Sequence, residues 1–366
     1  MRIAFDHQAF NWQSYGGVSR YYSKLADALL ALEQNVVIFA GAHRNNYLSS
    51  LPNDVVKGIK LSGYPPKMGR LFLATNHYWA NRKIIQWQPD IIHETYYSFM
   101  SSPKKTAPRV VTVYDMIHEL FPEMFGDNRI TQWKKNAFAR ADHIISISNS
   151  TKHDLVKFFD VDPGKVSVVH LGTEVPKSSV NARNASSLGK PFLLYVGARD
   201  GYKNFVAFLQ AVASSNRLSG EFDIVAFGGG EFSADELRVI ESLKFGQNQV
   251  RQLAGTDKVL SELYSNASAL IYPSLYEGFG LPPLEAMANG CPVISSNTSS
   301  MPEVIANAGE FFDPNSNEEI ATAIENVVFS LSRTAELKLN GLERVKTFSW
   351  QKCAQETLDI YKAITG

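Results

Sequence analysis

Two glutamates bracket a glycine-rich turn in the stretch LYEGFGLPPLEAMANGCPVISS, residues 275–296. Glu277 precedes the turn 278–280, and Glu285 follows it eight residues after the first glutamate. Carboxylates accept hydrogen bonds from hydroxyl groups, and exposed backbone N–H groups bind anions or polar oxygens. The segment is therefore either the edge of a ligand pocket or an ordinary turn between two apolar runs.

The residues after this turn predict a short helix. Pro282-Pro283 fits its first turn, where the missing N–H groups are tolerated, and Gly290 ends it. Glu285 then lies near the helix N-terminus, and the turn folds back so that both carboxylates edge one pocket. Its floor would be three backbone amides, those of Phe279, Gly280 and Leu281. The alternatives are a surface Glu285 stabilised by the helix dipole and a turn-forming Glu277.

A second loop carries two cations. In VGARDGYKNF, residues 196–205, Arg199 and Lys203 follow an apolar run that predicts a strand. Ligands of open parallel sheets bind at the carboxyl ends of strands. An Arg that binds bidentately and a compact Lys charge suit a pyrophosphate at that place. The alternative is a solvated loop with ordinary surface charges.

A third loop, NWQSYGGVSRYY, residues 11–22, follows the first predicted strand. Gly16 and Gly17 allow close backbone approach, or a positive φ, directly before a helix. The alternative is a tight turn that only leads into the helix. Two adjacent glycines alone are weak support for a ligand loop.

Short apolar runs predict the strands that position these loops. Nearly every residue in the runs is apolar, which favours strands buried on both faces of a parallel sheet. In the first half of the chain the runs span 2–6, 35–41, 90–94, 109–115, 143–148 and 165–171. Helices are clearest at 18–32 and 151–159, the second capped by Asn149 or Ser150. Repeated strand–helix–strand units imply an α/β fold with a doubly wound parallel sheet.

The same pattern stops and starts again in the second half. Further runs span 191–197, 222–228, 250–255, 268–274 and 292–296. The polar residues between the two sets carry no periodicity and predict a linker. We therefore expect an N-terminal domain, 1–172, a linker, 173–190, a C-terminal domain, 191–348, and a final segment, 349–366, forming a helix that reaches back to the first domain.

Composition bounds the class of protein. At 366 residues, with 45% hydrophobic and 20% charged residues, the chain is long enough for two globular domains. Lys+Arg and Asp+Glu balance at 36 each, which argues against a nucleic-acid partner. Two distant cysteines exclude a disulfide framework and a cysteine-rich metal site. With no signal peptide and no 18-residue apolar run, we expect a cytoplasmic protein that at most touches a membrane from outside.

These motifs together resemble a known family. Glu277-x7-Glu285 within YPSLYEGFGLPPLEAMANGCPVISS is followed by SSMPEV and AGEFFDP. Earlier motifs are YGGVSRYYSKLADAL, ADHIISISNSTKHDLVKFF, DPGKVSVVHLG and VGARDGYKN. The pattern resembles the retaining nucleotide-sugar glycosyltransferases of family 4, and in particular bacterial mannosyltransferases of polysaccharide and O-antigen assembly. The resemblance implies the GT-B fold, two Rossmann-like domains that face each other across a cleft.

The resemblance also implies roles for single residues. Arg199 and Lys203 would neutralise the pyrophosphate of the donor, and Glu285 would hydrogen-bond its ribose. Glu277 and the amides of residues 279–281 would hold the transferred sugar, and Gly17 would approach the phosphate or sugar. The eight-residue spacing would thus separate a sugar-facing carboxylate from a ribose-facing one.

One position departs from the family pattern. In many relatives the strand matching VVTVYD ends in His-Asp, with the histidine facing the donor sugar. Here Tyr114 stands at that position, and His118 follows in YDMIHELFPE. Tyr114, Asp115 and His118 are therefore the candidates for this contact. The alternative for His118 is a loop histidine bonded to the backbone.

Glycosyl transfer must stabilise a sugar cation and a departing diphosphate. No Asp-x-Asp metal motif follows a predicted strand, so we expect no metal and no cofactor beyond the nucleotide-sugar donor. The resemblance implies a front-face route with retention, with Glu277 as a positioning group. Hydrolysis by paired carboxylates fits poorly because it leaves Arg199 and Lys203 without a role.

Other functions remain as alternatives. A nicotinamide oxidoreductase would need Gly-x-Gly-x-x-Gly spacing after the first strand, which SYGGVSR lacks. A GT-B epimerase or phosphorylase, and a non-catalytic nucleotide-sugar-binding protein, stay open. Tyr114 is the one residue that favours the non-catalytic alternative.

The donor and acceptor are inferred by analogy. The segment YDMIHELFPE is similar to that of GDP-mannose users, while UDP and dTDP sugars stay open. A lipid-linked glycan is the expected acceptor, with a glycan alone as the alternative. Residues 65–83 mix basic and aromatic side chains and could rest on the inner face of a membrane. An amphipathic helix packed on the sheet is the simpler interpretation of that segment.

Overall fold

The computed structural model describes residues 1–64, 68–98, 100, 106–126, 129–174, 190–199 and 201–366. The chain divides into two compact units, each with its own sheet. The first unit comprises Met1–Gly172 and Trp350–Gly366, and the second comprises Thr173–Ser349. The expected linker, 173–190, lies for the most part outside the described residues.

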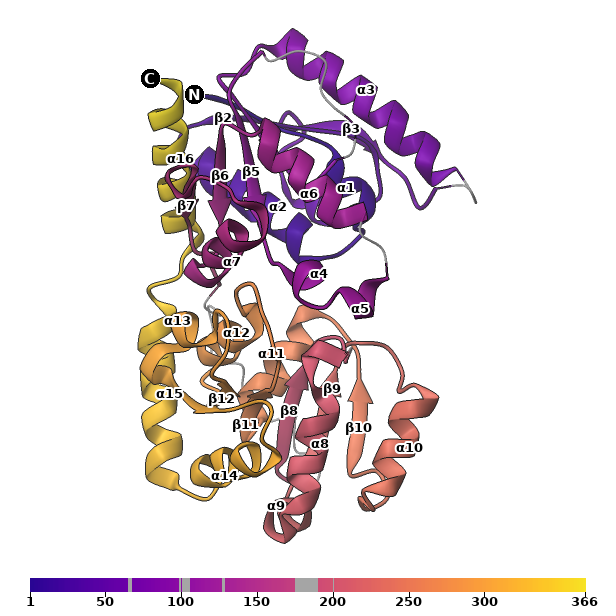
Figure 1. Ribbon diagram of the computed structural model, residues 1–366, viewed down its shortest axis with the longest axis vertical. Coiled ribbons are helices and arrows are strands. Elements are labelled where there is room, and N and C mark those ends of the chain that lie inside the picture. Colours follow the sequence, from indigo (N-terminus) through magenta and orange to yellow (C-terminus); the bar gives the residue numbers. More distant parts are fainter. Residues whose placement is uncertain (65–67, 99, 101–105, 127–128, 175–189, 200) are drawn as a thin grey trace. The chain divides into compact units, whose positions relative to one another are not determined.

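The first unit is built on a seven-stranded parallel sheet in the order β3-β2-β1-β4-β5-β6-β7 (Figure 1). Its strands are β1 (Arg2–Phe5), β2 (Asn35–His43), β3 (Val56–Lys60), β4 (Ile91–Glu94), β5 (Arg109–Val113), β6 (His143–Ser146) and β7 (Val166–Val168). The central strands β4 and β5 are buried along their whole length. Such strands read as continuous apolar runs because both faces are covered.

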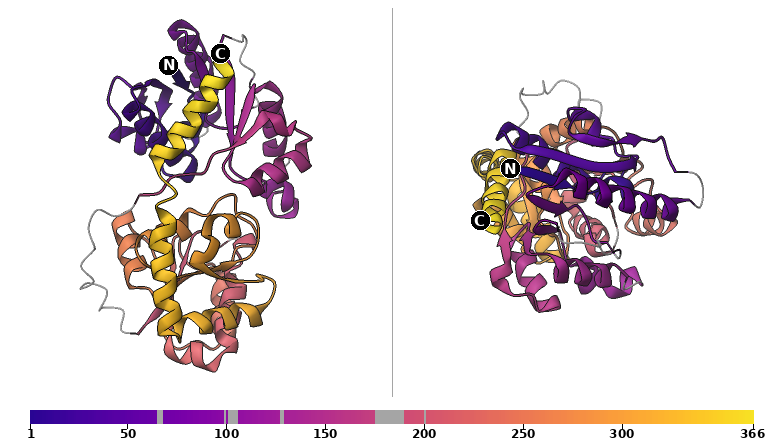
Figure 2. Two further views of the ribbon diagram at one scale, coloured as in Figure 1. Left: turned by 90° about the vertical axis from the view of Figure 1, so that its left-hand side faces the viewer. Right: turned by 90° about the horizontal axis from the view of Figure 1, so that it is seen from above.

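Helices connect these strands. They are α1 (Gln8–Trp12), α2 (Gly17–Ala31), α3 (Gly69–Trp87), α4 (Ile117–Leu120), α5 (Pro122–Phe125), α6 (Arg129–Arg140) and α7 (Asn149–Phe159), with 3₁₀ turns η1 (Tyr47–Ser50) and η2 (Pro163–Lys165). The last helix of the chain, α16 (Trp350–Thr365), also belongs to this unit and packs on α2 (Figure 2). A buried hydrogen bond of 2.5 Å between Tyr361 Oη and His93 Nδ1 ties α16 to β4.

The second unit repeats this architecture with a six-stranded parallel sheet in the order β10-β9-β8-β11-β12-β13. Its strands are β8 (Phe192–Val196), β9 (Asp223–Phe227), β10 (Val250–Leu253), β11 (Ala269–Tyr272), β12 (Val293–Ser296) and β13 (Gly309–Phe312). Counted from its own first strand, the order matches that of the first unit over six strands. Both units are therefore doubly wound, Rossmann-like sheets.

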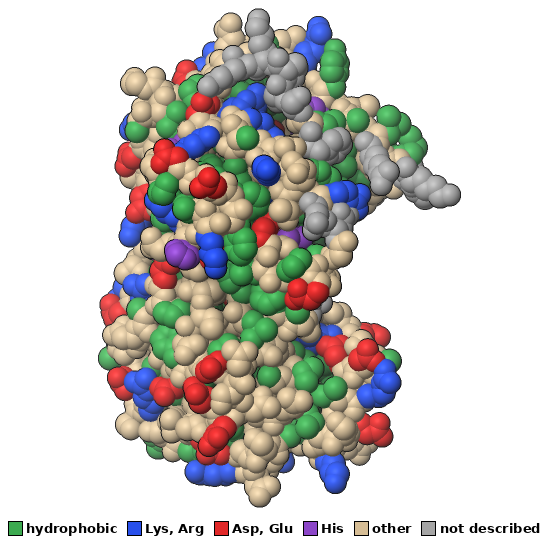
Figure 3. Space-filling view, in the orientation of Figure 1, with side chains coloured by type: hydrophobic (Ala, Val, Ile, Leu, Met, Phe, Trp, Pro, Cys, Tyr) green, Lys and Arg blue, Asp and Glu red, His purple; other side chains and the backbone are tan. Residues whose placement is uncertain are grey.

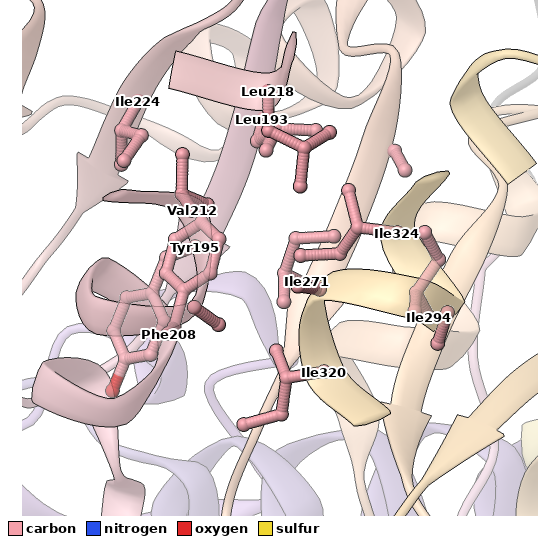
Figure 4. Close-up of a cluster of buried hydrophobic side chains, with 14 of the residues drawn as sticks. Leu193, Tyr195, Phe208, Val212, Leu218, Ile224, Ile271, Ile294, Ile320 and Ile324 are labelled. Carbon is pink, nitrogen blue, oxygen red and sulfur yellow. The ribbon is translucent and has the colours of Figure 1, made fainter. Parts of the chain in front are cut away.

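The helices of the second unit are α8 (Phe205–Ser214), α9 (Asn216–Glu221), α10 (Ala234–Ser242), α11 (Asp257–Asn266), α12 (Leu281–Ala288), α13 (Met301–Ile305), α14 (Asn317–Val328) and α15 (Leu331–Val345), with η4 (Gly201–Lys203) and η5 (Ala306–Ala308). One face of the sheet packs on α8 and α14 through a cluster of branched and aromatic side chains (Figure 4). Leu193, Phe208 and Ile324 are fully buried in this cluster. Such packing holds the strand ends, and the loops that leave them, in place.

Two strands and one cap differ from the sequence-based expectation. The apolar-run criterion does not find the edge strands β3 and β13, because β3 is mostly exposed and β13 is buried only at its two ends. The helix 149–159 is capped by Ser148, whose Oγ accepts the Thr151 N–H at 3.0 Å, so the expected caps Asn149 and Ser150 were wrong. Helix positions and strand positions otherwise agree to within a few residues.

The face drawn in Figure 3 shows no dominant sign of charge among the described residues. Basic and acidic side chains are interspersed over the face drawn in Figure 3, in line with the balanced composition. Among the described residues, no helix combines the length and the apolar character needed to cross a membrane.

Candidate active site

Each sheet has one place where the strand order reverses, between β1 and β4 in the first unit and between β8 and β11 in the second. In open parallel sheets, ligands bind beyond the carboxyl ends of the strands at this point. The loops that leave these four strands contain most of the residues that the sequence suggests for chemistry.

An ion pair occupies this place in the second unit. Lys203, just beyond β8, lies with its Nζ 2.7 Å from Oε1 of Glu277, which follows β11. A backbone hydrogen bond of 2.8 Å from Leu275 N–H to the Tyr202 carbonyl holds the two loops together. Burial, and then the charge of Glu277, raises the pKa of the Tyr272 hydroxyl well above its usual value. The structure therefore brings together two of the predicted site residues, 74 positions apart in the chain.

The loop after Glu277 is fixed by serine hydroxyls. Ser299 Oγ accepts the Glu277 N–H at 2.9 Å. Ser300 Oγ donates to the carbonyls of Glu277 and Phe279 at 2.8 and 3.0 Å. The Phe279 ring is buried and packs edge-on against Phe348. The turn thus has one defined shape, which its own backbone alone would not give it.

Gly280 requires its glycine. Its φ of +106° is a conformation that residues with a side chain rarely adopt, and a Cβ there would lie 2.5 Å from Met301 Cε. The next residue, Leu281, begins α12, so the amides of residues 280 and 281 lie at a helix N-terminus. Glu285 is half-buried in this helix, and Tyr264 Oη donates to its carboxylate at 3.4 Å.

Arg199 has a different environment from Lys203. Its Nε donates to Glu236 Oε1 at 2.5 Å, and Nη1 donates to the Gly228 carbonyl at 2.8 Å. Nη2 donates to the carbonyls of Gly230 and Glu231 at 3.0 and 2.9 Å. The predicted contact of Arg199 with a pyrophosphate stays a prediction. Asp200, next to it, lies outside the described residues.

In the first unit, Gly17 begins α2, and Gly16 before it is in extended backbone at φ 169°. A Cβ on Gly17 would meet nothing within 4 Å, so the protein itself does not require a glycine here. A Cβ on Gly16 would collide with the Gln13 side chain. The predicted ligand contact of Gly17 stays a prediction.

The three candidates around position 115 fall in different places. The Tyr114 ring is buried and packs against Tyr21, away from solvent. Asp115 Oδ1 accepts the Ile117 N–H at 3.2 Å and lies 3.6 Å from Lys134 Nζ. His118, on α4, packs its ring 4.3 Å from that of Phe125. Burial, and then the nearby charge of Lys134, lowers the pKa of His118, which favours the neutral imidazole.

A cavity of about 940 Å³ opens beside His118 at the carboxyl edge of this sheet. Its volume lies in the range of small-molecule sites. Four aromatic side chains form much of its wall, and the polar side chains are few. The lining residues are Ala9, Trp12, Gln13, Val18, Leu73, Tyr96, His118, Phe125, Arg129, Ile130 and Trp133.

Comparison with known proteins agrees with this geometry. The model of the "Glycosyl transferases group 1" family matches residues 177–341, and the "Glycosyltransferase Family 4" model matches residues 15–175. This chain belongs to the GT-B glycosyltransferases. Together the two matches cover most of the sequence, one for each unit.

Relatives of this glycosyltransferase differ in the sugars that their names give. The chain is 27% identical over 276 residues to the "O-antigen chain mannosyltransferase B" of Escherichia coli, covering 72% of each. It is 25% identical to the "Alpha-maltose-1-phosphate synthase" of Mycolicibacterium smegmatis, covering 100% of both. The solved structure of Anabaena Alr3699/HepE in complex with UDP-glucose covers 99% of the chain with a TM-score of 0.74 at 17% identity.

Sequence reasoning missed a buried charged group of this glycosyltransferase, on the helices α4 and α6 that also line the cavity. The Lys134 side chain is 1% exposed, and its Nζ lies 2.7 Å from Glu119 Oε2 and 2.9 Å from the Asp115 carbonyl. Thr131 Oγ1 donates to the other carboxylate oxygen of Glu119 at 2.7 Å. The available signal was a lysine on the apolar face of a helix, between Trp133 and Ala137. Such a lysine needs a buried partner.

Proposed function

We propose that this glycosyltransferase moves a hexose from a nucleoside diphosphate sugar to a glycan acceptor with retention of configuration. The observation that carries the proposal is the Lys203–Glu277 pair at the strand-order reversal of the second unit, beside the ordered turn 278–281. Mannose from GDP-mannose is the first candidate donor, because a curated relative is named a mannosyltransferase. UDP-glucose is the second, because a structural neighbour holds it.

In this proposal the ion pair holds the donor. The Lys203 and Glu277 side chains are 17% and 10% exposed, so each keeps some access to a ligand. As diphosphate oxygens approach Lys203, they share its charge and leave the Glu277 carboxylate to accept hydroxyl groups of the sugar. Glu285 hydrogen-bonds the ribose, and the amides at the start of α12 stabilise the transferred group.

The reaction breaks the bond between sugar C1 and the diphosphate oxygen and forms a bond between C1 and the acceptor oxygen on the same face. The acceptor proton passes to the departing diphosphate oxygen. Lys203 and the helix-terminal amides stabilise the negative charge that develops there. We therefore propose that transfer needs no metal ion and no further cofactor, and full turnover after treatment with EDTA is the expected result.

The first unit supplies the acceptor side of this proposal. The aromatic and aliphatic wall of its cavity suits the apolar part of a lipid-linked glycan. His118 lines the cavity and is the candidate contact to the acceptor or the sugar, and Asp115 holds the start of its segment. Exposed Leu71 and Tyr78 on α3 could rest on the inner face of a membrane, which would place the enzyme in the cytoplasm as a peripheral protein.

A transfer assay with paired variants tests the donor site. Nucleotide release and product mass are measured with GDP-mannose, UDP-glucose and a dTDP-sugar. Lys203→Ala and Glu277→Ala should each lower turnover by at least about 100-fold. Lys346→Ala, which removes a largely exposed lysine paired with Glu343 in the same unit, is the matched control and should leave turnover unchanged.

Thermal stabilisation by nucleotide separates the alternatives. A nucleoside diphosphate that binds the folded state raises the melting temperature by mass action. Stabilisation of the wild type without turnover on any acceptor would favour a non-catalytic binding protein. No stabilisation by GDP, UDP or dTDP would contradict the proposed donor site.

A further inference from the structure

Arg199 is enclosed by a turn of three glycines. Gly228, Gly229 and Gly230 have φ of +91°, +69° and +74°, and they follow β9 at the carboxyl edge of the second sheet. Such a run is accessible to glycine and strained for other residues. The turn has no side chains of its own, so groups elsewhere must fix its shape.

The guanidinium supplies that support. The carbonyls of Gly228, Gly230 and Glu231 converge on its two terminal nitrogens at 2.8 to 3.0 Å. A Cβ on Gly229 would lie 2.6 Å from Nη1, so the backbone lies directly against Arg199. The guanidinium also stacks 4.8 Å from the Phe232 ring centre.

Glu236 locks this arrangement from α10. Its Oε1 accepts from Arg199 Nε, and its Oε2 accepts the Ser233 N–H at 2.7 Å in the capping box of the helix. The Arg199 side chain is 4% exposed, against 17% for Lys203. To bind a diphosphate directly, Arg199 would have to break a buried ion pair and several hydrogen bonds to carbonyls, which is unfavourable.

The other side of the turn is left for a ligand. Within the part of the chain that the structure describes, the N–H groups of Gly229, Gly230 and Glu231 have no hydrogen-bond partner. Consecutive backbone N–H groups in such turns form anion-binding concavities. The turn leaves β9, which pairs with β8, the strand that leads to Lys203.

We propose that Arg199 is a positioning residue that holds the Gly228–Gly230 turn in the shape in which its backbone N–H groups receive the phosphates of the donor. The proposal rests on the proposed function and assigns a further phosphate subsite to it. It differs from the sequence-based expectation, in which the guanidinium itself binds the pyrophosphate.

Replacement of Glu236 distinguishes direct phosphate binding by Arg199 from positioning of the turn. The two roles predict changes of opposite sign in the affinity for the nucleotide. In Glu236→Gln, the amide oxygen keeps the cap of α10, while its NH2 faces Arg199 and cannot accept from it. If Arg199 binds phosphate directly, losing this competing carboxylate should strengthen or preserve binding. If Arg199 positions the turn, binding should weaken by about tenfold.

The measurement is calorimetric titration of GDP, UDP and inorganic pyrophosphate into wild type, Glu236→Gln, Arg199→Lys and the double variant. Both single variants should weaken binding, and the double variant should be no weaker than the weaker single one, because both act through one turn. Glu310→Gln, which removes one of the two carboxylate partners of Arg333 elsewhere in the unit, is the matched control and should leave nucleotide affinity unchanged.

Amide spectra provide a second readout. In NMR spectra of the wild type, the N–H resonances of Gly229 and Gly230 should shift when GDP or UDP is added. In Glu236→Gln these resonances should not shift. Unchanged or tighter binding by Glu236→Gln overturns the positioning role while leaving the proposed function intact. Absence of any nucleotide binding by folded wild type overturns both.

Discussion

The two units share a strand order over six strands but differ in the chemistry at the corresponding edge. The first unit has a cavity of about 940 Å³ with an aromatic wall, and the second has an ion pair beside glycine turns. All eight histidines of the chain lie within residues 1–172, and the second unit has none. The sheet fixes where a ligand can bind, and the loops decide which ligand it is.

At each edge a lysine pairs with a glutamate, and the two pairs differ in burial. Lys134 and Glu119 have side chains 1% and 4% exposed, and the Asp115 carbonyl and Thr131 are further partners. Lys203 and Glu277 are 17% and 10% exposed. A fully enclosed pair supports structure, whereas a partly open pair can exchange its partner for a ligand.

The largest expected effect tests this difference directly. Lys134→Met leaves Glu119 buried without its cation and should destabilise the first unit by about 3–5 kcal/mol. Lys203→Met should change unfolding much less, while it removes donor binding. Urea unfolding followed separately for the two units measures both, because a two-unit chain need not unfold in one step. Adding Glu119→Gln to Lys134→Met should recover part of the loss, and equal effects of the two lysines would refute the distinction.

The second largest expected effect is that acid should destabilise the first unit more than the second. Burial lowers the pKa of His93 to about 3. Between that value and the usual 6.5, the unfolded state binds a proton that the folded state does not, so stability falls as pH falls. At pH 5 this amounts to about 2 kcal/mol for His93 alone. Melting temperatures measured from pH 7.5 to 5 should show the histidine effect in the first unit only, and His93→Gln should flatten its slope.

Two glycines sharpen the comparison further. Gly280→Ala places a Cβ at a φ of +106° and near Met301 Cε, and should destabilise the second unit by about 1–3 kcal/mol. Gly17→Ala in the first unit meets open space and should leave stability nearly unchanged. Thermal melts compare the two variants. Lost transfer by a stable Gly17→Ala would support its predicted contact with the donor.

The smallest expected effect concerns the cavity wall. Trp133→Ala removes an aromatic side chain from the lining and should raise the KM for a lipid-linked acceptor by about fivefold. The KM for the donor should stay the same because Lys203 and Glu277 lie in the other unit. A change confined to the donor KM would contradict the assignment of this cavity to the acceptor.

The sequence predicts the doubly wound sheets because buried parallel strands read as apolar runs, as at 109–113. It also predicts that Lys203 and Glu277 lie on loops at the carboxyl ends of strands, but it does not predict their ion pair. It does not predict β3, which is mostly exposed, or β13, which is buried only at its two ends. Nor does it show that Arg199 turns to Glu236, because spacing along the chain carries no information on which nearby acceptor a cation prefers.

The sequence does not predict the cavity either. Trp12, Phe125 and Trp133 come from three separate helices and Tyr96 from the loop after β4. An aromatic residue at such a position predicts packing as readily as a ligand wall. Lys134 and Glu119 lie 15 residues apart on different helices, so their pairing appears only when α4 and α6 are placed.

The hydrogen bond between Tyr361 and His93 bears on how the chain is made. Most of the first unit consists of residues 1–172, yet the helix that packs over Tyr22 and His93 consists of residues 350–365. During synthesis the whole second unit is therefore translated before the first can close. In a nascent chain, the second unit should therefore form its hydrophobic core before the first unit acquires α16.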